Sequence, residues 1–173
     1  MTVETISDDV ILLRPFTLED AEVHLRGEDD ELIKWLSDGK STLAGVNHWI
    51  EQNTLSMKNG GPVFTFGIVA DGTLVGMVEM RNDLLSSEGF TSGDVNISYG
   101  IYPRYRRRGY ASRAVRLMVN FVANRGFHKA IIKVSPHNDR SLRVAERCGF
   151  TKERQLVTEN GEPMIIYVKQ VSR

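Results

Sequence analysis

The segment from Tyr102 to Ala111 gathers the residues best suited to binding an anion. It lies between an alternating, strand-like stretch and an amphipathic helical stretch, and it contains Gly109 and four arginines, Arg104, Arg106, Arg107 and Arg108. Backbone N–H groups at the start of a helix are unpaired and the helix dipole is positive there, so such a junction attracts phosphate. Gly109 would let a ligand approach the backbone, and Ala111 keeps the first turn narrow. The segment therefore predicts a phosphate site, with a solvated arginine loop as the alternative.

Charge is divided unevenly along the chain. The 173 residues carry a formal net charge of +0, but residues 1–100 hold 17 acids and 6 bases, and residues 101–173 hold 5 acids and 16 bases. A basic half indicates an anionic partner, while an acidic half in the same chain argues against a long nucleic acid. Guanidinium groups bind phosphate through paired hydrogen bonds. The available cations are Arg104, Arg107, Arg108, Arg113 and Arg143.

Length and composition predict one domain, residues 1–173, in a reducing compartment. One domain is expected at this length, and the only cysteine, Cys148, cannot form an internal disulfide. The first residues carry acids where a signal peptide carries bases, and no apolar run reaches the ~20 residues of a membrane span. We therefore expect a cytoplasmic protein without membrane contact. The four histidines lack ligand spacing, so no metal is expected.

The elements that must position the arginine segment follow from periodicity and turn signals. Asp71-Gly72 between two apolar runs predicts a hairpin, and a strand, helix, strand order over 95–135 predicts a right-handed crossover with parallel pairing. Strands are predicted over 10–16, 63–70, 73–80, 95–102 and 130–135 and on both sides of Asn160-Gly161. Helices are predicted over 18–26 and 29–36, from a Ser41 or Thr42 cap to about residue 57, over 111–122, and from Asn138 or Asp139 to Gly149. The total is an α+β chain with about seven strands and four or five helices.

Three motifs, in order along the chain, resemble the GNAT superfamily of acyl-CoA-dependent N-acyltransferases. Residues 106–111 (Arg-Arg-Arg-Gly-Tyr-Ala) match its Arg/Gln-x-x-Gly-x-Gly/Ala signature. Residues 138–141 (Asn-Asp-Arg-Ser) and 149–150 (Gly-Phe) resemble its Asn-x-x-Ser/Ala segment and closing Gly-Phe. Residues 13–20 resemble the opening of the branch that contains the ribosomal-protein alanine N-acetyltransferases. The resemblance spans nearly the whole chain and implies a GNAT fold: a mixed, mostly antiparallel seven-stranded sheet with splayed fourth and fifth strands.

The same resemblance implies acetyl-CoA as cosubstrate. It places the pantetheine arm between the splayed strands, against the backbone of Tyr99 and Ile101, with Asn138 near the pantetheine or the substrate end. The pyrophosphate would lie on the N–H groups of Arg106, Arg107, Arg108, Gly109, Tyr110 and Ala111. The implied reaction moves an acetyl group directly to a primary amine of a small molecule or a protein N-terminus. A homodimer is compatible with it.

The two proton-transfer positions depart from the family pattern. Many members carry a glutamate where this chain has Asn96, and others carry a tyrosine where it has Ala145. An alkyl amine has a pKa near ~10, so a base must take its proton before it can attack. We assign the base to Glu79, whose apolar neighbours would raise its pKa, with Asp94 as the alternative. Ser141 would protonate or hydrogen-bond the departing sulfur, a role that the resemblance implies, and structural roles for both residues are the other interpretation.

Other functions are also consistent with the sequence. The missing glutamate and tyrosine would suit an acyl-CoA-binding regulatory module without turnover. The arginines of 104–116 would suit RNA binding, although bases and aromatic residues are not interleaved in a sheet-like pattern. Trp35, Trp49 and Phe66 either line an acceptor pocket or fill the core. The acidic first hundred residues favour a cationic acceptor.

Overall fold

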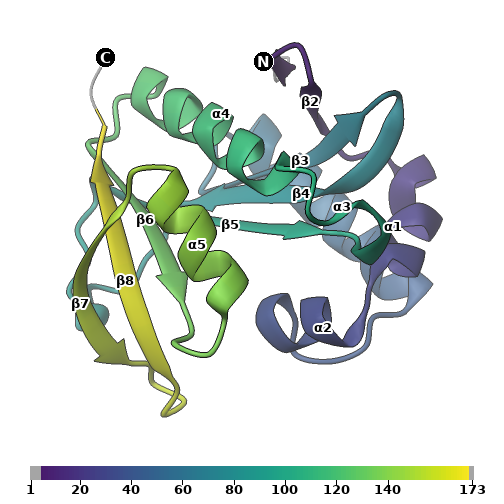
Figure 1. The fold of residues 1–173 in the computed structure, drawn as a ribbon. Coiled ribbons are helices and arrows are strands. Elements are labelled where there is room, and N and C mark those ends of the chain that lie inside the picture. The colour runs from purple at the N-terminus through teal and green to yellow at the C-terminus, as the bar shows by residue number, and fades with distance from the viewer. Residues whose placement is uncertain (1–4, 172–173) are drawn as a thin grey trace.

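The alternating and β-branched segments form one eight-stranded sheet in the computed structural model, which describes residues 5–171 (Figure 1). The strands are β1 (Ile6–Ser7), β2 (Ile11–Pro15), β3 (Val63–Ala70), β4 (Thr73–Arg81), β5 (Asp94–Ile101), β6 (Lys129–Val134), β7 (Thr151–Val157) and β8 (Pro163–Gln170). They follow the order β1-β2-β3-β4-β5-β6-β8-β7, and all described neighbours are antiparallel except β5 and β6. The mixed, mostly antiparallel α+β fold is confirmed. The sheet has eight strands where seven were predicted, because the two residues of β1 are too short to show any period.

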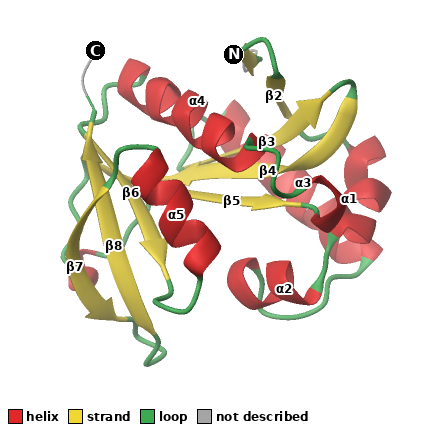
Figure 2. Cartoon of the chain, viewed as in Figure 1, coloured by secondary structure: helices red, strands yellow, loops and turns green. Residues whose placement is uncertain are grey.

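Residues 5–171 form five α-helices beside the sheet (Figure 2). They are α1 (Ala21–Gly27), α2 (Asp30–Leu36), α3 (Leu43–Lys58), α4 (Tyr110–Asn124) and α5 (Asp139–Arg147). The predicted cap of the third is confirmed, since Thr42 Oγ1 accepts the N–H of Gly45 at 3.1 Å. Helix α4 covers one face of the sheet together with α5, and α1 and α3 cover the other. Each face therefore has its own apolar cluster. No helix in residues 5–171 has the length and apolarity needed to cross a membrane.

The two predicted hairpins form at their turn signals. Asp71 and Gly72 have φ angles of +48° and +73°, the left-handed pair that a two-residue turn with the right twist requires. Gly161 also has a positive φ, +82°, in the turn between β7 and β8. These turns return β4 beside β3 and β8 beside β7.

The parallel strands β5 and β6 separate after a short pairing. They are in register only from Asp94 opposite Lys129 to Asn96 opposite Ile131. At that point the Asn96 side chain enters the ladder, and its Oδ1 accepts the N–H of Lys133 at 3.1 Å in place of a backbone carbonyl. Beyond it β6 continues against β8 while β5 runs toward the start of α4 (Figure 1). The predicted splay is thus confirmed, and it occurs at the position where the family pattern has glutamate.

Candidate active site

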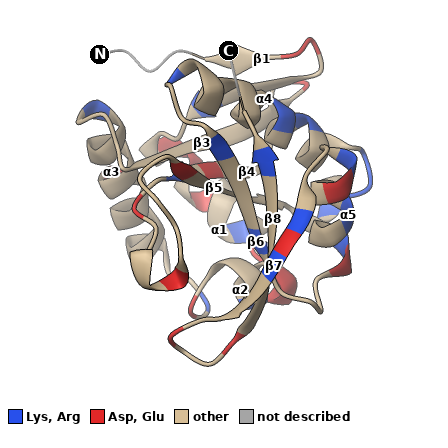
Figure 3. Ribbon diagram, turned by 90° about the vertical axis from the view of Figure 1, so that its left-hand side faces the viewer, with Lys and Arg blue, Asp and Glu red and all other residues tan. Residues whose placement is uncertain are grey.

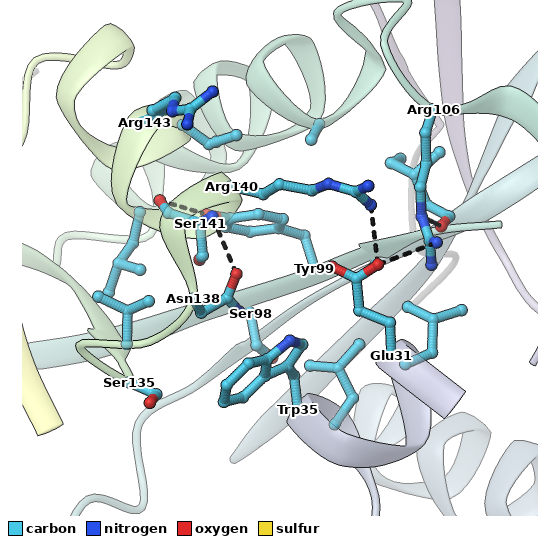
Figure 4. A pocket seen from close by; sticks show the side chains of 18 of the residues that line it. Glu31, Trp35, Ser98, Tyr99, Arg106, Ser135, Asn138, Arg140, Ser141 and Arg143 are labelled. Carbon is cyan, nitrogen blue, oxygen red and sulfur yellow. Dashed lines mark hydrogen bonds and ion pairs between the residues drawn. The ribbon is translucent and has the colours of Figure 1, made fainter. Parts of the chain in front are cut away.

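A cavity of about 760 Å³ occupies the divergence of β5 and β6. Its walls come from residues 97–101 of β5, 105–112 at the start of α4, 132–135 of β6 and the turn after it, and from α5 and α2 (Figure 4). Lys and Arg positions, blue in the ribbon of Figure 3, cluster around α5 and the neighbouring start of α4. We call this cavity the first cavity.

The edge of β5 that faces the first cavity offers backbone hydrogen bonds. The N–H of Tyr102 donates to the Val75 carbonyl of β4 at 2.9 Å. Because the direction of backbone groups alternates along a strand, Tyr99 and Ile101 turn theirs away from β4, toward the cavity. The Ile101 carbonyl accepts Arg106 Nε at 3.0 Å, in agreement with this alternation. An extended ligand could pair with this edge as a strand would, which fits the predicted contacts of Tyr99 and Ile101.

The start of α4 has the geometry of an anion site. Gly109 is the N-cap residue in a left-handed conformation with φ +79°, and a Cβ built on it would meet no atom within 4 Å. The first bond of the helix runs from the Arg113 N–H to the Gly109 carbonyl at 3.2 Å, so the N–H groups from Gly109 to Ser112 have no acceptor within the helix. Arg107, with φ +63°, holds a left-handed conformation that costs about 1–2 kcal/mol in a residue with a side chain. The predicted residues Gly109, Tyr110 and Ala111 all line the first cavity.

The arginines divide between the cavity wall and structural pairs. Of the five predicted cations, Arg107, Arg108 and Arg143 line the first cavity. Arg104 is not among the lining residues, and neither is Arg113, which pairs with Asp8 at 2.8 Å. Two further arginines of α5, Arg140 and Arg147, line the first cavity but were not predicted. Their helical spacing from Arg143 places all three on one face of the helix.

The guanidinium of Arg106, the first residue of the signature, forms its hydrogen bonds within the protein. It binds both carboxylate oxygens of Asp29 at 2.7 and 2.9 Å and Glu31 Oε2 at 3.1 Å, in addition to the Ile101 carbonyl. Its hydrogen bonds with Asp29 are the largest cause of the lowered pKa of that carboxyl. Arg106 therefore fixes α2 against the end of β5, and only its backbone is left for the predicted pyrophosphate contact.

A strand tyrosine and a helix serine meet inside the first cavity (Figure 4). The Tyr99 hydroxyl lies 2.7 Å from Ser141 Oγ and 3.2 Å from the Ser141 carbonyl. The Ser141 N–H donates to Asn138 Oδ1 at 3.2 Å, so Asn138 caps α5 while it lines the cavity. Burial raises the pKa of Tyr99 well above its usual range, so the phenol stays protonated. The structure thus brings together Tyr99, Asn138 and Ser141. It also shows that the Tyr99 side chain contacts Ser141, whereas the sequence predicted only a backbone contact for Tyr99.

A second cavity, of about 730 Å³, is lined by residues of α1, α2, α3, β4 and β5 and by the segment that joins α2 to α3. Glu79 of β4 lines it, beside Ser98 of β5. The Glu79 carboxylate accepts a hydrogen bond from Thr65 Oγ1 at 2.9 Å, and burial raises its pKa. The predicted base therefore lies in the second cavity, and the predicted serine in the first.

Aromatic side chains form one wall of the second cavity. Trp49 lines it and stacks on His24, with ring centroids 4.8 Å apart and an interplanar angle of 8°. His24 Nδ1 lies 2.6 Å from the Tyr102 hydroxyl, and burial lowers the His24 pKa to about 4. Trp35 lines the first cavity, whereas Phe66 is fully buried in the core.

The remaining candidates have structural surroundings. Asp94, the alternative base, is buried and accepts the Thr91 N–H at 2.8 Å, with Lys129 Nζ 3.3 Å away, and it lines neither cavity. Burial raises the pKa of the Cys148 thiol. Within residues 5–171, no group of three or more His, Cys, Asp or Glu side chains is placed to share a metal ion.

Comparison with known proteins identifies a matching family. The family model "Acetyltransferase (GNAT) domain" matches residues 11–151. No curated protein matches the chain in sequence.

Three solved structures illustrate the fold that the chain shares. A ribosomal L7/L12 α-N-protein acetyltransferase in complex with coenzyme A is 18% identical, with a TM-score of 0.82 over 97% of this chain and 98% of that one. An aminoglycoside acetyltransferase, AAC(6')-Ib, with paromomycin and acetyl-CoA is 22% identical, with a TM-score of 0.78 over 94% of both chains. A GNAT acetyltransferase from Bacillus anthracis is 22% identical, with a TM-score of 0.78 over 96% and 98%. At these identities the likeness concerns the fold.

Proposed function

The chain belongs to the acetyltransferase (GNAT) domain family, and from that premise we propose that it moves the acetyl group of acetyl-CoA to a primary amine held in the second cavity. As a member of the family it is an acetyl-CoA-dependent acyltransferase. One observation carries the proposal: the two cavities share the wall residues Ser98 and Gly100 of β5, so a thioester in the first and an amine in the second can meet there.

The first cavity suits coenzyme A by charge and by shape. The open N–H groups at the start of α4 would take the phosphates, together with the cavity arginines other than Arg106 and Arg140, which bind carboxylates of α2 and its N-cap. The free edge of β5 would pair with the amides of pantetheine. Asn138, whose Oδ1 is occupied by the cap, has its NH₂ group left to donate to the ligand.

The reaction needs a free amine, a polarised carbonyl and a proton for the leaving thiolate. Glu79 would accept the amine proton, and its raised pKa suits that role near neutral pH. The amine nitrogen then attacks the thioester carbon, whose oxygen a backbone N–H of the β5 edge can stabilise. When the C–S bond breaks, Ser141 donates its proton to the sulfur, and the new amide nitrogen releases its second proton to water. Ser141 then regains a proton from Tyr99, whose hydroxyl is 2.7 Å away, and Tyr99 in turn takes one from water.

The second cavity favours a cationic acceptor. Three carboxylates line it, those of Glu28, Asp38 and Glu79, against two bases, Lys40 and Arg81, and Arg81 is paired with Asp83. A protonated amine would be attracted to such a wall before it loses its proton. Small-molecule amines and protein N-termini both satisfy this chemistry, and the solved structures above include enzymes named for each.

The alternative is an acyl-CoA-binding regulatory module that does not turn over. Asn96 and Ala145 motivate it, since both common proton-transfer side chains are absent at their usual places. The positions of Glu79 in one cavity and of Ser141 with Tyr99 in the other favour the enzyme.

Thiol release from acetyl-CoA decides between the two functions. The protein is incubated with acetyl-CoA and a panel of N-terminal peptides, polyamines and aminoglycosides, and products are identified by a mass gain of one acetyl group. Transfer to at least one amine supports the proposal. Tight acetyl-CoA binding in calorimetry without transfer to any amine would establish the regulatory module.

A matched pair of variants tests the cofactor site. Gly109→Asp adds bulk and negative charge where the phosphates would lie, so CoA binding should disappear. Gly126→Asp is the control, because Gly126 has a similar φ of +84° and equally open surroundings but lines neither cavity. Loss of binding in both variants would indicate backbone damage and would refute the assignment.

A further inference from the structure

The partition between the two cavities is built from four residues. Leu32 and Leu36 of α2 and Ser98 and Gly100 of β5 line both cavities, and no other residue does so among those the structure describes. If the chain works as proposed above, the acyl group must lie at this partition when the amine attacks. The side chains that border it there are the two leucines.

The leucines lie directly against the strand. A Cβ built on Gly100 would be 2.6 Å from Leu36 Cδ1 and 2.8 Å from Leu32 Cδ2. The methyl groups thus occupy space that a side chain at position 100 would take. The space beside Gly100 is therefore too small to accept additional methylene groups unless the leucines move.

Helix α2 is held in this position from two sides. None of its residues is fully buried, so its place depends on contacts at its surface. Arg106 binds Asp29 and Glu31 at its start, and Arg140 of α5 binds Glu31 at 2.8 Å across the first cavity (Figure 4). These ion pairs resist the outward shift that a longer acyl group would require.

We propose that Leu32 and Leu36 set the size limit of the acyl group. The two-carbon acetyl group fits against their methyl groups, and each further methylene must displace one of them. A single methylene in a hydrophobic pocket changes selectivity by about 10-fold or more. The inference rests on the proposed function, which places acyl-CoA in the first cavity and its acyl group at the partition.

Acyl-CoA binding tests the limit without a known acceptor. Dissociation constants of acetyl-, propionyl- and butyryl-CoA are measured by calorimetry for the wild type, Leu36→Ala and Leu32→Ala. The wild type should bind butyryl-CoA at least about tenfold more weakly than acetyl-CoA, and each alanine variant should reduce that ratio to about threefold or less. Equal binding of both ligands by the wild type, or an unchanged ratio in both variants, would overturn the proposal.

A control leucine separates selectivity from general destabilisation. Leu43 on α3 is 41% exposed, as is Leu36, but it lines neither cavity. Leu43→Ala should keep the wild-type ratio, and a change equal to that of Leu36→Ala would also overturn the proposal. Failure of the wild type to bind acetyl-CoA would instead contradict the proposed function, so the two failures are distinguishable.

Discussion

The hydroxyl of Tyr99 lies 2.7 Å from Ser141 Oγ, although the two residues are 42 positions apart in the chain. The pairing joins the free edge of β5 to the first turn of α5, two of the elements that border the cavity proposed for the thioester. Position 145, where other family members carry a tyrosine, holds a fully buried alanine. A phenol is nevertheless present in this cavity, and it comes from the strand.

Removing the Ser141 hydroxyl should slow the chemical step. Ser141→Ala is expected to lower kcat about 10- to 100-fold, below the usual range for an acid because a thiol of pKa ~8.5 leaves readily. Tyr99→Phe should have a smaller effect, since it removes only the partner of Ser141. Steady-state kinetics and calorimetry check this, with acetyl-CoA affinity nearly unchanged in both variants.

The control for these variants is Tyr167→Phe. It also removes a phenol hydroxyl, which donates to Glu146 at 3.2 Å, but at a position that lines neither cavity. An unchanged kcat in Ser141→Ala would exclude proton delivery by this serine. Because burial keeps the pKa of Tyr99 far above neutrality, its ionisation should cause no loss of activity below pH 10.

Glu79→Gln should reduce activity and increase stability at the same time. Burial raises the Glu79 pKa, so wild-type kcat/KM should fall as the pH drops through that raised value, and the glutamine variant should lose this limb with most of its activity. A raised acid pKa means that the folded state binds the proton more tightly. Above that pKa the buried charge therefore costs stability, and Glu79→Gln should melt at a higher temperature than the wild type at pH 8.

The pH profile and the melting temperature are both compared with Glu51→Gln. Glu51 is exposed on α3 and lines neither cavity, so its neutralisation should leave both measurements near wild type. A Glu79→Gln variant that keeps the wild-type acid limb would remove Glu79 as the base.

The helices and hairpins could be predicted well because each turn, cap and periodic pattern is encoded within a short stretch of sequence. The Asp71-Gly72 turn, the cap at Thr42 and the period of α4 need no knowledge of distant residues. The splay of β5 and β6 was expected from the resemblance alone. The bond from the Lys133 N–H to Asn96 Oδ1, at the point where the strands separate, involves a polar side chain that no alternation pattern marks.

The site was less predictable because its side chains meet across long sequence distances. Arg106 finds Asp29 across 77 residues, and Arg140 finds Glu31 across 109. In the sequence, an arginine that will pair with a distant carboxylate looks the same as one that is available to a ligand. The signature arginine and the cavity arginines of α5 could therefore not be distinguished by charge. The role of α2 at the partition depends on how Leu32 and Leu36 meet Gly100, which only packing determines.

Arg106→Ala should loosen α2 and lower stability by about 1–2 kcal/mol at neutral pH, less than for a fully buried pair because water still reaches it. Hydrogen bonds from Arg106 lower the Asp29 pKa, so the stabilisation is present at neutral pH and is lost as the pH falls below the ordinary value of 3.8. Urea unfolding should show a smaller stability difference between the wild type and Arg106→Ala at pH 3 than at pH 7.

Hydrogen exchange locates this effect. Amides of residues 30–36 should exchange faster in Arg106→Ala, whereas Arg113→Ala, which breaks the more exposed pair with Asp8, should leave them protected. An equal stability gap at pH 3 and pH 7 would show that Arg106 acts through packing and not through its carboxylate partners.

His24 should titrate near pH 4 and should make the protein less stable in mild acid. Its buried ring on Trp49 favours the neutral imidazole, which lowers its pKa from 6.5 to about 4. Between pH 6.5 and pH 4 the unfolded chain therefore binds a proton at His24 that the folded chain does not bind. Stability falls as the pH drops through this range, by on the order of 3 kcal/mol in total.

The unfolding free energy is measured as a function of pH for the wild type and for His24→Gln. The difference between the two isolates the contribution of His24, because Glu79 makes the same, opposite contribution in both proteins. His48→Gln, an exposed histidine on α3, should keep the wild-type slope. An NMR midpoint above pH 6 for His24 would contradict the buried, neutral ring.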